Sequence, residues 1–358
     1  MRAAIFTGAG EALSIAEVKE LAPGPRDVVV EIAASGVCHT DLGVLKGSLP
    51  YPPPLVLGHE ACGRVTWAGS EVSTVNVGDL VISSPDPMCG RCYFCIHGQP
   101  NLCELLFAPP TPRVALSDGT EVCGMSGLGT FAEEMTVHEA YVVPIQSDLP
   151  PEQLALIGCG VNTGMGAAIN GGQIQPGMTV AVIGCGGVGL SAIQGARLSG
   201  ASEVIAVDTL AAKLEVAARL GATQVINASE GDPVEAVLAA TGGRGVDVAL
   251  EVVGLVSTTQ QALAMARRGG TVVMVGAPPL GARLELDAFD FFMSQKRFTG
   301  SVFGHANIRR DFPRYVRLAE RGALDLDGLI SARISLDEVN DALGALERGE
   351  RIRSVIVH

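Results

Sequence analysis

The polar and apolar residues of the chain follow two different patterns, one over the first 150 residues and the other from Thr179. In the first pattern, short apolar segments such as Val28–Ile32 and Asp79–Ile82 are bounded by Gly, Pro or Asp, which is typical of β-strands joined by turns. From Thr179 onward, apolar runs alternate with helical segments, the first of which are Gly187–Leu198 and Thr209–Leu220. Strands that alternate with helices predict a parallel sheet with helices on both of its faces.

Six strands are expected in this second part of the chain, which is the number found in the two mononucleotide-binding halves of a doubly wound sheet. They are predicted at Thr179–Ile183, Glu203–Asp208, Gln224–Ile226, Asp247–Leu250, Thr271–Val275 and Phe298–Val302. Beyond them, the pattern predicts a helix near Asp311–Arg321 and a last strand over Ser354–Val357. The predicted fold class is therefore α/β.

Length, composition and charge narrow the class of protein. A chain of 358 residues is long enough for two domains, and its 47% hydrophobic and 18% charged residues exclude a disordered polyelectrolyte. A net charge of −13 repels phosphate backbones and anionic lipid surfaces, so we expect neither nucleic acid nor a membrane as a partner. The uncharged stretch from Gln153 to Ala196 is broken by glycines and Pro176, which argues against a transmembrane helix.

A glycine-rich motif follows the first strand of the second pattern. Gly184-x-Gly186-x-x-Gly189 stands between this strand and a helix, where glycines permit a tight turn and let a pyrophosphate approach the helix N-terminus. Asp208 ends the next strand, and a carboxylate there accepts the ribose hydroxyls of NAD and repels the 2′-phosphate of NADP. The alternative is an ordinary glycine turn, with Asp208 as a helix cap.

Four of the nine cysteines lie close together, as Cys89-x2-Cys92-x2-Cys95-x7-Cys103. Four thiolates in one short segment suit a closed tetrahedral zinc site, whose role is structural because no coordination position stays open. An iron–sulfur cluster is the rival, although the x7 interval differs from the bacterial spacing, and disulfides are a second alternative. Because no secretory signal is apparent after Met1, we expect reduced thiols and a cytoplasmic protein.

Three further residues, far apart in the sequence, form a second candidate metal site: Cys38, His59 and Cys159. An isolated cysteine is usually a small buried hydrophobe, and an isolated histidine is usually hydrogen-bonded or on the surface. Together, two cysteines and one histidine are the ligands of a catalytic zinc with an open fourth position. Zinc in such a site is a Lewis acid and lowers the pKa of bound water from 15.7 to about 7, and an alcohol must likewise lose its proton before it gives up a hydride.

At these residues the chain resembles the zinc-dependent medium-chain alcohol dehydrogenases over essentially its whole length. The resemblance is carried, in order, by Gly36–Asp41, Gly58–Glu60, the four-cysteine segment, Gly158–Gly164, the glycine motif and Ile352–Ser354. It implies a GroES-like, mainly-β catalytic domain built from residues 1–160 and 304–358, and a Rossmann NAD-binding domain at residues 161–303. It also implies a homodimer or homotetramer, formed partly through the sheet edge near Phe298–Val302.

The resemblance also implies roles for individual residues. The catalytic group comprises the zinc ligands Cys38, His59 and Cys159, with Glu60 just behind the metal among its possible ligands, Asp41 orienting His59, and Thr40 meeting the substrate oxygen. The NAD-binding group comprises His39 and Arg353 at the pyrophosphate, Lys213 and Asp208 at the ribose, Thr163 near the nicotinamide, Val275, and the loop residues Gly184, Gly186, Gly187, Val188 and Gly189. For His39, Lys213 and Arg353, the alternative is a solvated surface charge.

Several positions depart from the common family pattern. Gly43 stands where many members carry a histidine that passes the proton to solvent, and His39 stands where many carry an arginine; both resemble the aryl and allylic alcohol branch. The loop Gly47–Leu49 lacks the acidic residue of the glutathione-linked formaldehyde branch, and Leu49 beside a proline run predicts an apolar pocket wall. We therefore expect NAD-dependent interconversion of a hydrophobic primary alcohol, aryl or allylic, and its aldehyde.

Three alternatives stay open. The first alternative is a nicotinoprotein whose NAD never leaves. The second is a formaldehyde dehydrogenase that acts on a thiol adduct, and the third is a redox sensor that holds NAD and zinc without turnover. The cofactor motif does not separate the first alternative from an ordinary dehydrogenase. The complete ligand set of the open zinc site argues against the last one.

Overall fold

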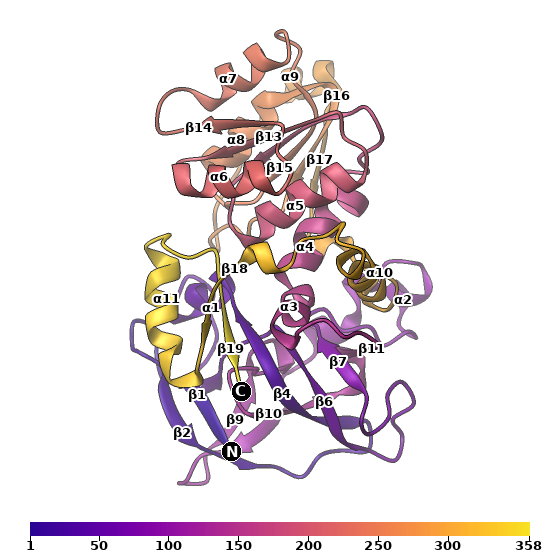
Figure 1. Cartoon of the computed structure of the whole chain (residues 1–358), viewed down its shortest axis with the longest axis vertical. Helices are drawn as coiled ribbons and strands as arrows, with labels where there is room; N and C mark the ends of the chain where they lie inside the picture. The colour runs from indigo at the N-terminus through magenta and orange to yellow at the C-terminus, as the bar shows by residue number, and fades with distance from the viewer. The chain divides into compact units, whose positions relative to one another are not determined.

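The computed structural model describes all residues from 1 to 358 and divides the chain into two compact units (Figure 1). The first unit combines Met1–Cys159 with Asn307–His358, and the second unit is the continuous segment Gly160–Ala306. The second unit is therefore inserted into the first. The boundaries expected from the sequence, at residues 160 and 304, lie within three residues of these limits.

The second unit contains one six-stranded sheet in which all neighbouring strands are parallel. Its strand order is β14-β13-β12-β15-β16-β17, so the direction of winding changes between β12 and β15. Ligands of such sheets bind at the carboxyl ends of the strands, where the order changes. The strands are β12 (Thr179–Ile183), β13 (Glu203–Asp208), β14 (Gln224–Asn227), β15 (Val246–Glu251), β16 (Ala266–Met274) and β17 (Arg297–Gly300).

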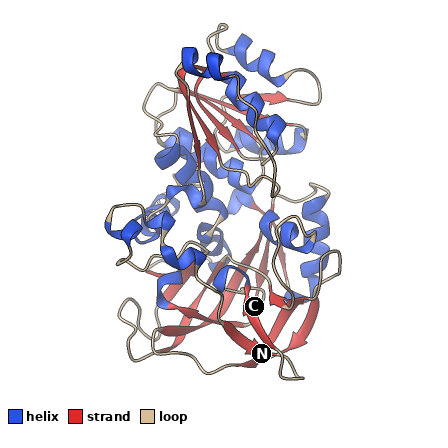
Figure 2. Cartoon of the chain, turned by 180° about the vertical axis from the view of Figure 1, so that it is seen from behind, coloured by secondary structure: helices blue, strands red, loops and turns tan.

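Helices cover both faces of this sheet, with α5 and α6 on one face and α7 and α8 on the other (Figures 1 and 2). Every residue of β12 is buried, which explains its uninterrupted apolar sequence. The predicted doubly wound parallel sheet is thus confirmed. The helical segments are α4 (Gly160–Gly166), the π-helix η6 (Ala167–Gly171), α5 (Gly187–Leu198), α6 (Ala211–Arg219), α7 (Pro233–Ala240), α8 (Val256–Met265), α9 (Ala288–Ser294) and the short η7 (Phe303–His305).

The first unit is mainly β and contains two sheets. One has the strand order β2-β1-β5-β9-β8-β3, and the other has the order β11-β7-β6-β4-β19-β18, with β10 also paired to β4. The strands are β1 (Arg2–Phe6), β2 (Ser14–Glu17), β3 (Lys19–Glu20), β4 (Asp27–Val37), β5 (Leu55–Val56), β6 (Ala61–Ala68), β7 (Leu80–Ser83), β8 (Pro112–Ala115), β9 (Glu121–Gly124), β10 (Glu134–His138), β11 (Val142–Ile145), β18 (Ile330–Ile334) and β19 (Arg353–Val357).

The long strand β4 joins distant parts of the chain. Its first half pairs with β10 and its second half with the C-terminal strand β19, both antiparallel, while β6 runs along its other edge. Val28, Val30 and Ile32 pack into one apolar cluster, whereas Val37 and Ile356 of β19 pack into another. The end of β4, which is followed by Cys38, is therefore fixed beside the C-terminal strand β19.

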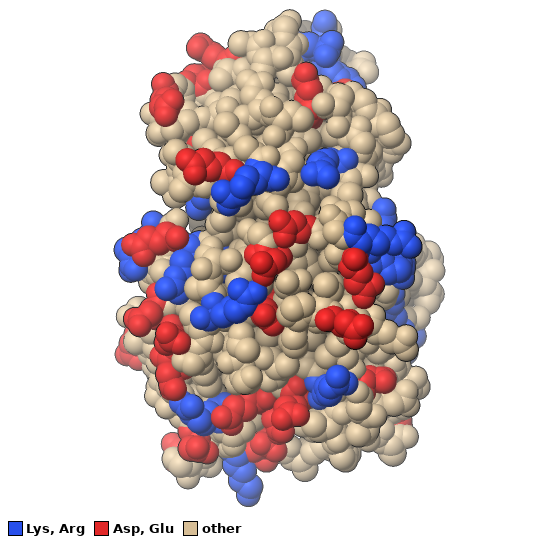
Figure 3. All heavy atoms as spheres, in the orientation of Figure 1, with Lys and Arg blue, Asp and Glu red and all other residues tan.

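Short helices connect the strands of the first unit. The α-helices are α1 (His39–Leu45), α2 (Tyr93–Ile96), α3 (Pro151–Ala155), α10 (Ile308–Glu320) and α11 (Val339–Glu347), and the 3₁₀ turns are η1 (Pro100–Leu102), η2 (Glu104–Phe107), η3 (Met125–Gly127), η4 (Glu139–Tyr141), η5 (Leu156–Gly158), η8 (Asp327–Leu329) and η9 (Leu336–Glu338). None of the helices in the structure combines the length and the apolar character needed to cross a membrane. On the face drawn in Figure 3, basic side chains are interspersed with acidic ones.

Candidate metal and cofactor sites

Four buried side chains in the first unit direct donor atoms to one point. They are Cys38, His59, Glu60 and Cys159, and their donor atoms all lie within 4.8 Å of one another. Cys38 stands between β4 and α1, His59 and Glu60 come directly before β6, and Cys159 directly follows η5. The fold thus brings together three segments that the sequence separates by up to 121 residues.

Asp41 fixes two of these donors at once. Its Oδ1 accepts hydrogen bonds from Nδ1 of His59 at 3.1 Å and from the backbone N–H of Gly58 at 3.1 Å. Its Oδ2 accepts from the backbone N–H of Cys38 at 2.9 Å. When Nδ1 of His59 donates to Asp41, the neutral ring has its lone pair on Nε2, which is the usual arrangement for a histidine that ligates a metal.

Two buried polar atoms of this group have no partner in the protein. They are Nε2 of His59 and Oε1 of Glu60, which lie 3.9 Å apart. Buried polar atoms normally form hydrogen bonds, so an unpaired nitrogen among two thiols and a carboxyl needs another partner. Zinc fits this donor set, since two cysteines and one histidine are known ligands of a catalytic zinc with one open position.

Glu60 and Arg353 form a buried ion pair beside the metal-binding group. Oε2 of Glu60 accepts a hydrogen bond from the Arg353 guanidinium, so Oε1 is left facing His59. Gly36 makes room for this carboxyl, because a Cβ at Gly36 would lie 2.2 Å from Oε2 of Glu60. The sequence predicted Arg353 as a pyrophosphate contact; the structure places its side chain 3% exposed and against Glu60, and the predicted contact stays a prediction.

Burial, hydrogen bonds and neighbouring charges shift the pKa values of the side chains in this group. A hydrogen bond with Cys159 holds the pKa of the Cys38 thiol well below its usual range, while the same bond and burial raise the pKa of Cys159. Burial raises the pKa of Glu60 to about 7, against the opposing charge of Arg353. One thiol is therefore prepared to act as a thiolate, and a cation at this point favours deprotonation of the second.

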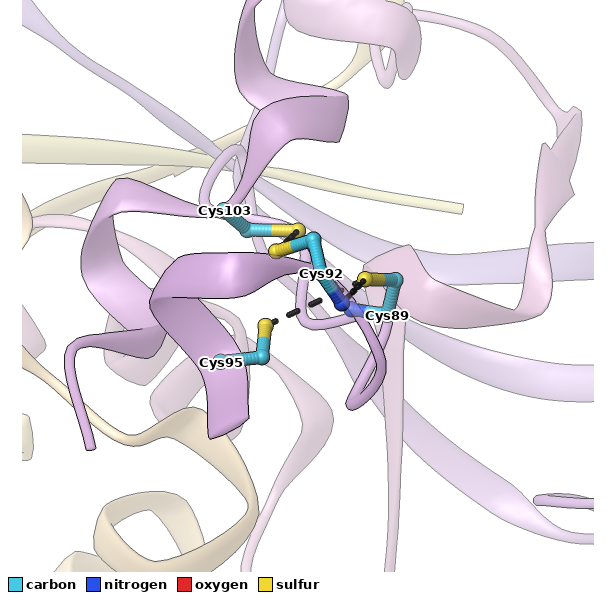
Figure 4. A group of neighbouring side chains, drawn as sticks. All are labelled: Cys89, Cys92, Cys95 and Cys103. Carbon is cyan, nitrogen blue, oxygen red and sulfur yellow. Dashed lines mark hydrogen bonds between the residues drawn. The ribbon is translucent and has the colours of Figure 1, made fainter. Parts of the chain in front are cut away.

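The four clustered cysteines meet in a separate lobe of the first unit (Figure 4). Their Sγ atoms lie within 4.8 Å of one another; the pairs Cys89–Cys95 and Cys92–Cys103 are both 3.9 Å apart. This distance is nearly twice a disulfide bond, and all nine cysteines are free. Four thiolates at about 2.3 Å from one zinc ion would stand about 3.8 Å apart, so the cluster fits a single tetrahedral zinc.

The glycine motif of the second unit forms a tight turn at the carboxyl end of β12. Gly184 has φ +98°, and a Cβ there would lie 2.8 Å from a methyl group of Val253. A Cβ at Gly189 would lie 1.8 Å from the carbonyl oxygen of Gly184, so only glycine lets α5 start this close to the turn. A Cβ at Gly186 would meet no atom within 4 Å, which leaves the outer side of the loop open to a ligand.

Asp208 is fixed directly against this loop. Its Oδ2 accepts a hydrogen bond from the backbone N–H of Cys185 at 2.7 Å, and its Oδ1 accepts from Leu210 N–H at 3.0 Å. The second bond closes a local turn before α6, whose N-cap is Leu210 and not Asp208 as the helix-cap alternative expected, and the first joins the carboxylate to the glycine loop. Lys213 lies on the first turns of α6, and its charge acts on Cys185 in the same loop.

The structure also gives the surroundings of four other residues with predicted roles in cofactor or substrate binding. The Thr163 side chain is 8% exposed, and its Oγ1 has no partner, which leaves it able to meet a ligand. Val275 follows β16 at the carboxyl edge of the sheet, and its N–H donates to the carbonyl of Glu251. In the first unit, His39 is exposed and Oγ1 of Thr40 lies 3.6 Å from Sγ of Cys38.

Other buried polar side chains without a predicted role also have unpaired atoms. Among them are Asn162 on α4, Ser301 directly after β17, and Asp86 between β7 and the cysteine lobe. For Ser301 a signal existed, because a polar residue at the carboxyl end of a strand in a doubly wound sheet lies where ligands bind. For Asp86 no motif existed, since Pro85-Asp86-Pro87 is typical of a plain turn.

Comparisons with known proteins agree with this architecture. Residues 24–147 match the alcohol dehydrogenase GroES-like domain, and residues 187–321 match the zinc-binding dehydrogenase family. The chain is 37% identical over 366 residues to an S-(hydroxymethyl)glutathione dehydrogenase of Synechocystis, with 99% of both chains covered.

Two crystal structures are similar along nearly the whole chain. One is an alcohol dehydrogenase zinc-binding domain protein from Burkholderia ambifaria, with a TM-score of 0.95 and 33% identity. The other is benzyl alcohol dehydrogenase from Acinetobacter calcoaceticus, with a TM-score of 0.93 and 34% identity. Each comparison covers 99% of this chain and 98% of the other.

A doubly wound sheet with a glycine-rich loop and two groups of side chains that fit zinc are the features of a zinc- and nucleotide-dependent oxidoreductase. The chain belongs to the zinc-dependent medium-chain alcohol dehydrogenase family. The family, the GroES-like and Rossmann folds and the zinc and nicotinamide cofactors expected from the sequence are thereby confirmed.

Proposed function

We propose that the protein catalyses the NAD-dependent oxidation of a hydrophobic primary alcohol, aryl or allylic, and the reverse reduction of the aldehyde. The observation that carries this proposal is the unpaired Nε2 of His59 among Cys38, Cys159 and Glu60. A redox sensor without turnover has no need for a mixed ligand set with an open position, whereas Lewis-acid chemistry requires one.

Each residue of the group has a task in this reaction. Cys38, His59 and Cys159 would hold the zinc, which supplies a Lewis acid for the alcohol or aldehyde oxygen. Asp41 keeps the His59 ring in the ligating tautomer through the 3.1 Å bond to Nδ1. Thr40, whose Oγ1 lies 3.6 Å from Sγ of Cys38, would accept the alcohol proton before the hydride leaves.

Asp208 supports a preference for NAD over NADP. Its carboxylate is fixed by the N–H of Cys185 at the glycine loop, where it can accept both ribose hydroxyls and would repel a 2′-phosphate. In Asp208→Gly, the ratio of kcat/KM for NAD to that for NADP should fall by about 10-fold or more, because this repulsion is lost. Wild-type protein that works better with NADP would refute this assignment.

An apolar wall beside Gly43 supports the choice of alcohol. Leu49 packs against the same apolar cluster as Leu42 and Val44 of α1, and its side chain lies 3.1 Å from the position of a Cβ at Gly43. An apolar surface favours an aryl or allylic group over a polar one. A relative of nearly the same fold is a benzyl alcohol dehydrogenase, which supports the same choice.

A thiol adduct of formaldehyde is the second candidate substrate. It is favoured by the 37% identity to an S-(hydroxymethyl)glutathione dehydrogenase. The loop Gly47–Leu49 argues against this substrate, because the loop offers no charged side chain to a peptide-like thiol.

A panel of alcohols tests these choices. NAD reduction is followed at the nicotinamide absorbance with benzyl alcohol, cinnamyl alcohol, ethanol and S-hydroxymethylglutathione. We expect the highest kcat/KM with benzyl or cinnamyl alcohol. Faster reaction with the glutathione adduct would replace the proposed substrate, and no reaction with any member would refute the proposed activity. Protein that arrives with nicotinamide absorbance and does not release it would be a nicotinoprotein.

We further propose a homodimer or homotetramer that acts in the cytoplasm. Strand β17 is an edge of its sheet, and the adjacent helix α9 exposes large apolar side chains: Phe289 is 74% exposed and Phe292 is 72% exposed. An uncovered sheet edge with apolar neighbours favours association with a second copy. The nine free cysteines suit a reducing compartment. Light scattering on the eluted protein tests the oligomeric state, and a monomer would refute it.

A further inference from the structure

Asp86 is a buried carboxyl group without a partner. Its side chain is 2% exposed, and neither Oδ1 nor Oδ2 accepts or donates a hydrogen bond. Burial raises its pKa to about 8. A buried, unpaired acid costs stability, and such groups persist in folded proteins where they serve a function.

The local backbone cannot supply the missing partner. Asp86 lies between Pro85 and Pro87, and prolines have no N–H to donate. An aspartate in a turn often accepts from the N–H two residues further on, but the N–H of Met88 donates to the carbonyl of Ala140 at 2.9 Å. The carboxyl group therefore needs a donor from outside its own turn.

A phenol within the electrostatic influence of Asp86 is also engaged. Besides burial, the charge of Asp86 contributes to the raised pKa of Tyr141. However, the Tyr141 hydroxyl donates its only proton to the carbonyl of Leu105 at 3.3 Å. No side chain of the protein satisfies Asp86.

The segment that carries Asp86 borders the catalytic group. Strands β6 and β7 pair antiparallel, so residues before β6 and residues after β7 lie at the same end of the sheet. Those before β6 are the proposed ligands His59 and Glu60. After β7, the Ser83 hydroxyl accepts from the N–H of Ala61 at 2.8 Å, and a Cβ at Gly158 would lie 2.5 Å from the Ser83 carbonyl oxygen. Asp86 is three residues further along.

We propose that Asp86 is a specificity-determining residue, whose carboxyl group accepts a hydrogen bond from a second donor on the alcohol substrate. The inference rests on the proposed function and narrows it to alcohols that carry a hydroxyl or ammonium group besides the reacting one. The apolar wall at Leu49 takes the hydrocarbon part, and the acid takes the distal donor. A site built to pair a donor rejects analogues without one, because its own polar group is then left unpaired.

The test compares matched substrates. Benzyl alcohols with a hydroxyl, a methyl or an aminomethyl group at the meta or para position are assayed with wild type, Asp86→Asn and Asp86→Leu. We expect wild type to prefer the hydroxyl over the methyl compound by about 10- to 100-fold in kcat/KM, as for a buried polar group that loses its hydrogen-bond partner. In Asp86→Leu this ratio should fall to about one or invert. The aminomethyl compounds show whether an ammonium donor is preferred to a hydroxyl.

A stability measurement separates this role from a structural one. Asp86→Leu removes an unpaired buried acid, so its melting temperature should equal or exceed that of wild type, with zinc content unchanged. The matched control is Asp27→Leu, because Asp27 is also buried but is paired with Arg113. The control should melt lower and keep the wild-type substrate ratio. A destabilised Asp86→Leu with the wild-type ratio would overturn the proposal.

Calorimetric titration of the same ligands in the presence of NADH repeats the comparison without turnover. Tighter binding of the hydroxyl compounds to wild type alone supports the role of Asp86, even if no alcohol is oxidised and the proposed function fails. Oxidation of benzyl alcohol without any preference for a second donor refutes the role of Asp86 and leaves the proposed function intact.

Discussion

The two groups of metal ligands in the first unit differ in how the fold assembles them. The four cysteines of the lobe lie within 15 residues of sequence, and three of them are partly exposed. The group around His59 draws on three distant segments, and all of its members are buried. A local cluster depends on the metal to hold its own loop, whereas a dispersed cluster is held in place by the sheets around it.

The surroundings of the two groups differ in the same way. In the lobe, the cysteine sulfurs interact with one another and with backbone N–H groups of the same loop, such as that of Cys92 to Cys89 at 3.4 Å. Around His59, the side chains of Asp41 and Arg353 orient the donors, and two donor atoms stay unpaired. Loss of a lobe ligand should therefore affect stability first, and loss of a ligand near His59 should affect chemistry first.

The largest expected effect on catalysis is that of Cys159→Ser. We expect kcat/KM to fall on the order of 10⁴-fold, because the Lewis acid supplies several kcal/mol and its ligand set is incomplete. Elemental analysis should find one zinc per chain instead of two, and the melting temperature should change by only a few degrees. A variant that keeps both zinc ions and activity within tenfold of wild type would contradict the assignment.

For the lobe, Cys92→Ser should mainly destabilise the protein. We expect one zinc per chain and a melting temperature lower by about 5 °C or more, because structural zinc supplies folding free energy. The protein that remains folded should keep kcat within about tenfold. Cys123→Ser, at a partly buried cysteine outside both groups, is the control and should retain two zinc ions. Unchanged melting and zinc content in Cys92→Ser would exclude a structural role.

The second unit could be predicted closely from the sequence, because its pattern is local. Strands such as Thr179–Ile183 are buried on both faces and read as continuous apolar runs, and α5 has the bounds that the sequence predicted. The start of β16 at Ala266 was missed, because Arg267, Arg268 and two glycines interrupt the apolar pattern. In the first unit, the pairing of β19 with β4 is set by contacts more than 300 residues apart, and no local pattern indicates it.

The candidate metal ligands could be predicted because the thiol of cysteine and the imidazole of histidine are metal donors, and their presence is visible in the sequence itself. The contacts of charged residues were harder to predict from the sequence. Arg353 was expected at a pyrophosphate, yet its place against Glu60 depends on the register of β19 beside β4 and on the space that Gly36 leaves. Asp86 was missed because a sequence does not show that a turn is buried and that its usual donors are already engaged.

The next effect in size concerns the proton. Thr40→Ala should lower the rate of hydride transfer by about 10²–10⁴-fold, the usual range of acid–base assistance, while both zinc ions remain. Thr40→Ser keeps the hydroxyl and should restore most of the rate. Deuterated alcohol isolates the chemical step in both variants. Near-wild-type hydride transfer in Thr40→Ala would mean that the proton leaves by another route.

A smaller loss is expected when the orientation of His59 is weakened. Asp41→Asn removes the charge that holds Nδ1 of His59 and the N–H of Cys38, and such outer contacts contribute about 10- to 100-fold in metal affinity or activity. A competing chelator should remove the zinc near His59 more easily, while the lobe zinc resists as in wild type. Asp118→Asn, an exposed turn residue, is the control. Equal loss of both zinc ions would show that the two groups are not independent.

The smallest effect is expected at Gly43, where many relatives carry a histidine. Gly43 lies in α1 without a positive φ, and an added Cβ would approach Leu49 at 3.1 Å and Ser48 at 3.3 Å, both through side chains that can move. Gly43→His should therefore fold, and Gly43→Ala serves as the steric control. An imidazole with a pKa near 6.5 is a base at neutral pH, so it should raise alcohol oxidation at pH 6.5–7.5 by less than about tenfold and move the acidic limb of the pH–rate profile downward. The same change in Gly43→Ala would assign the effect to the displaced Leu49 side chain. No change in either variant would show that the proton already passes from Thr40 to water without a further base.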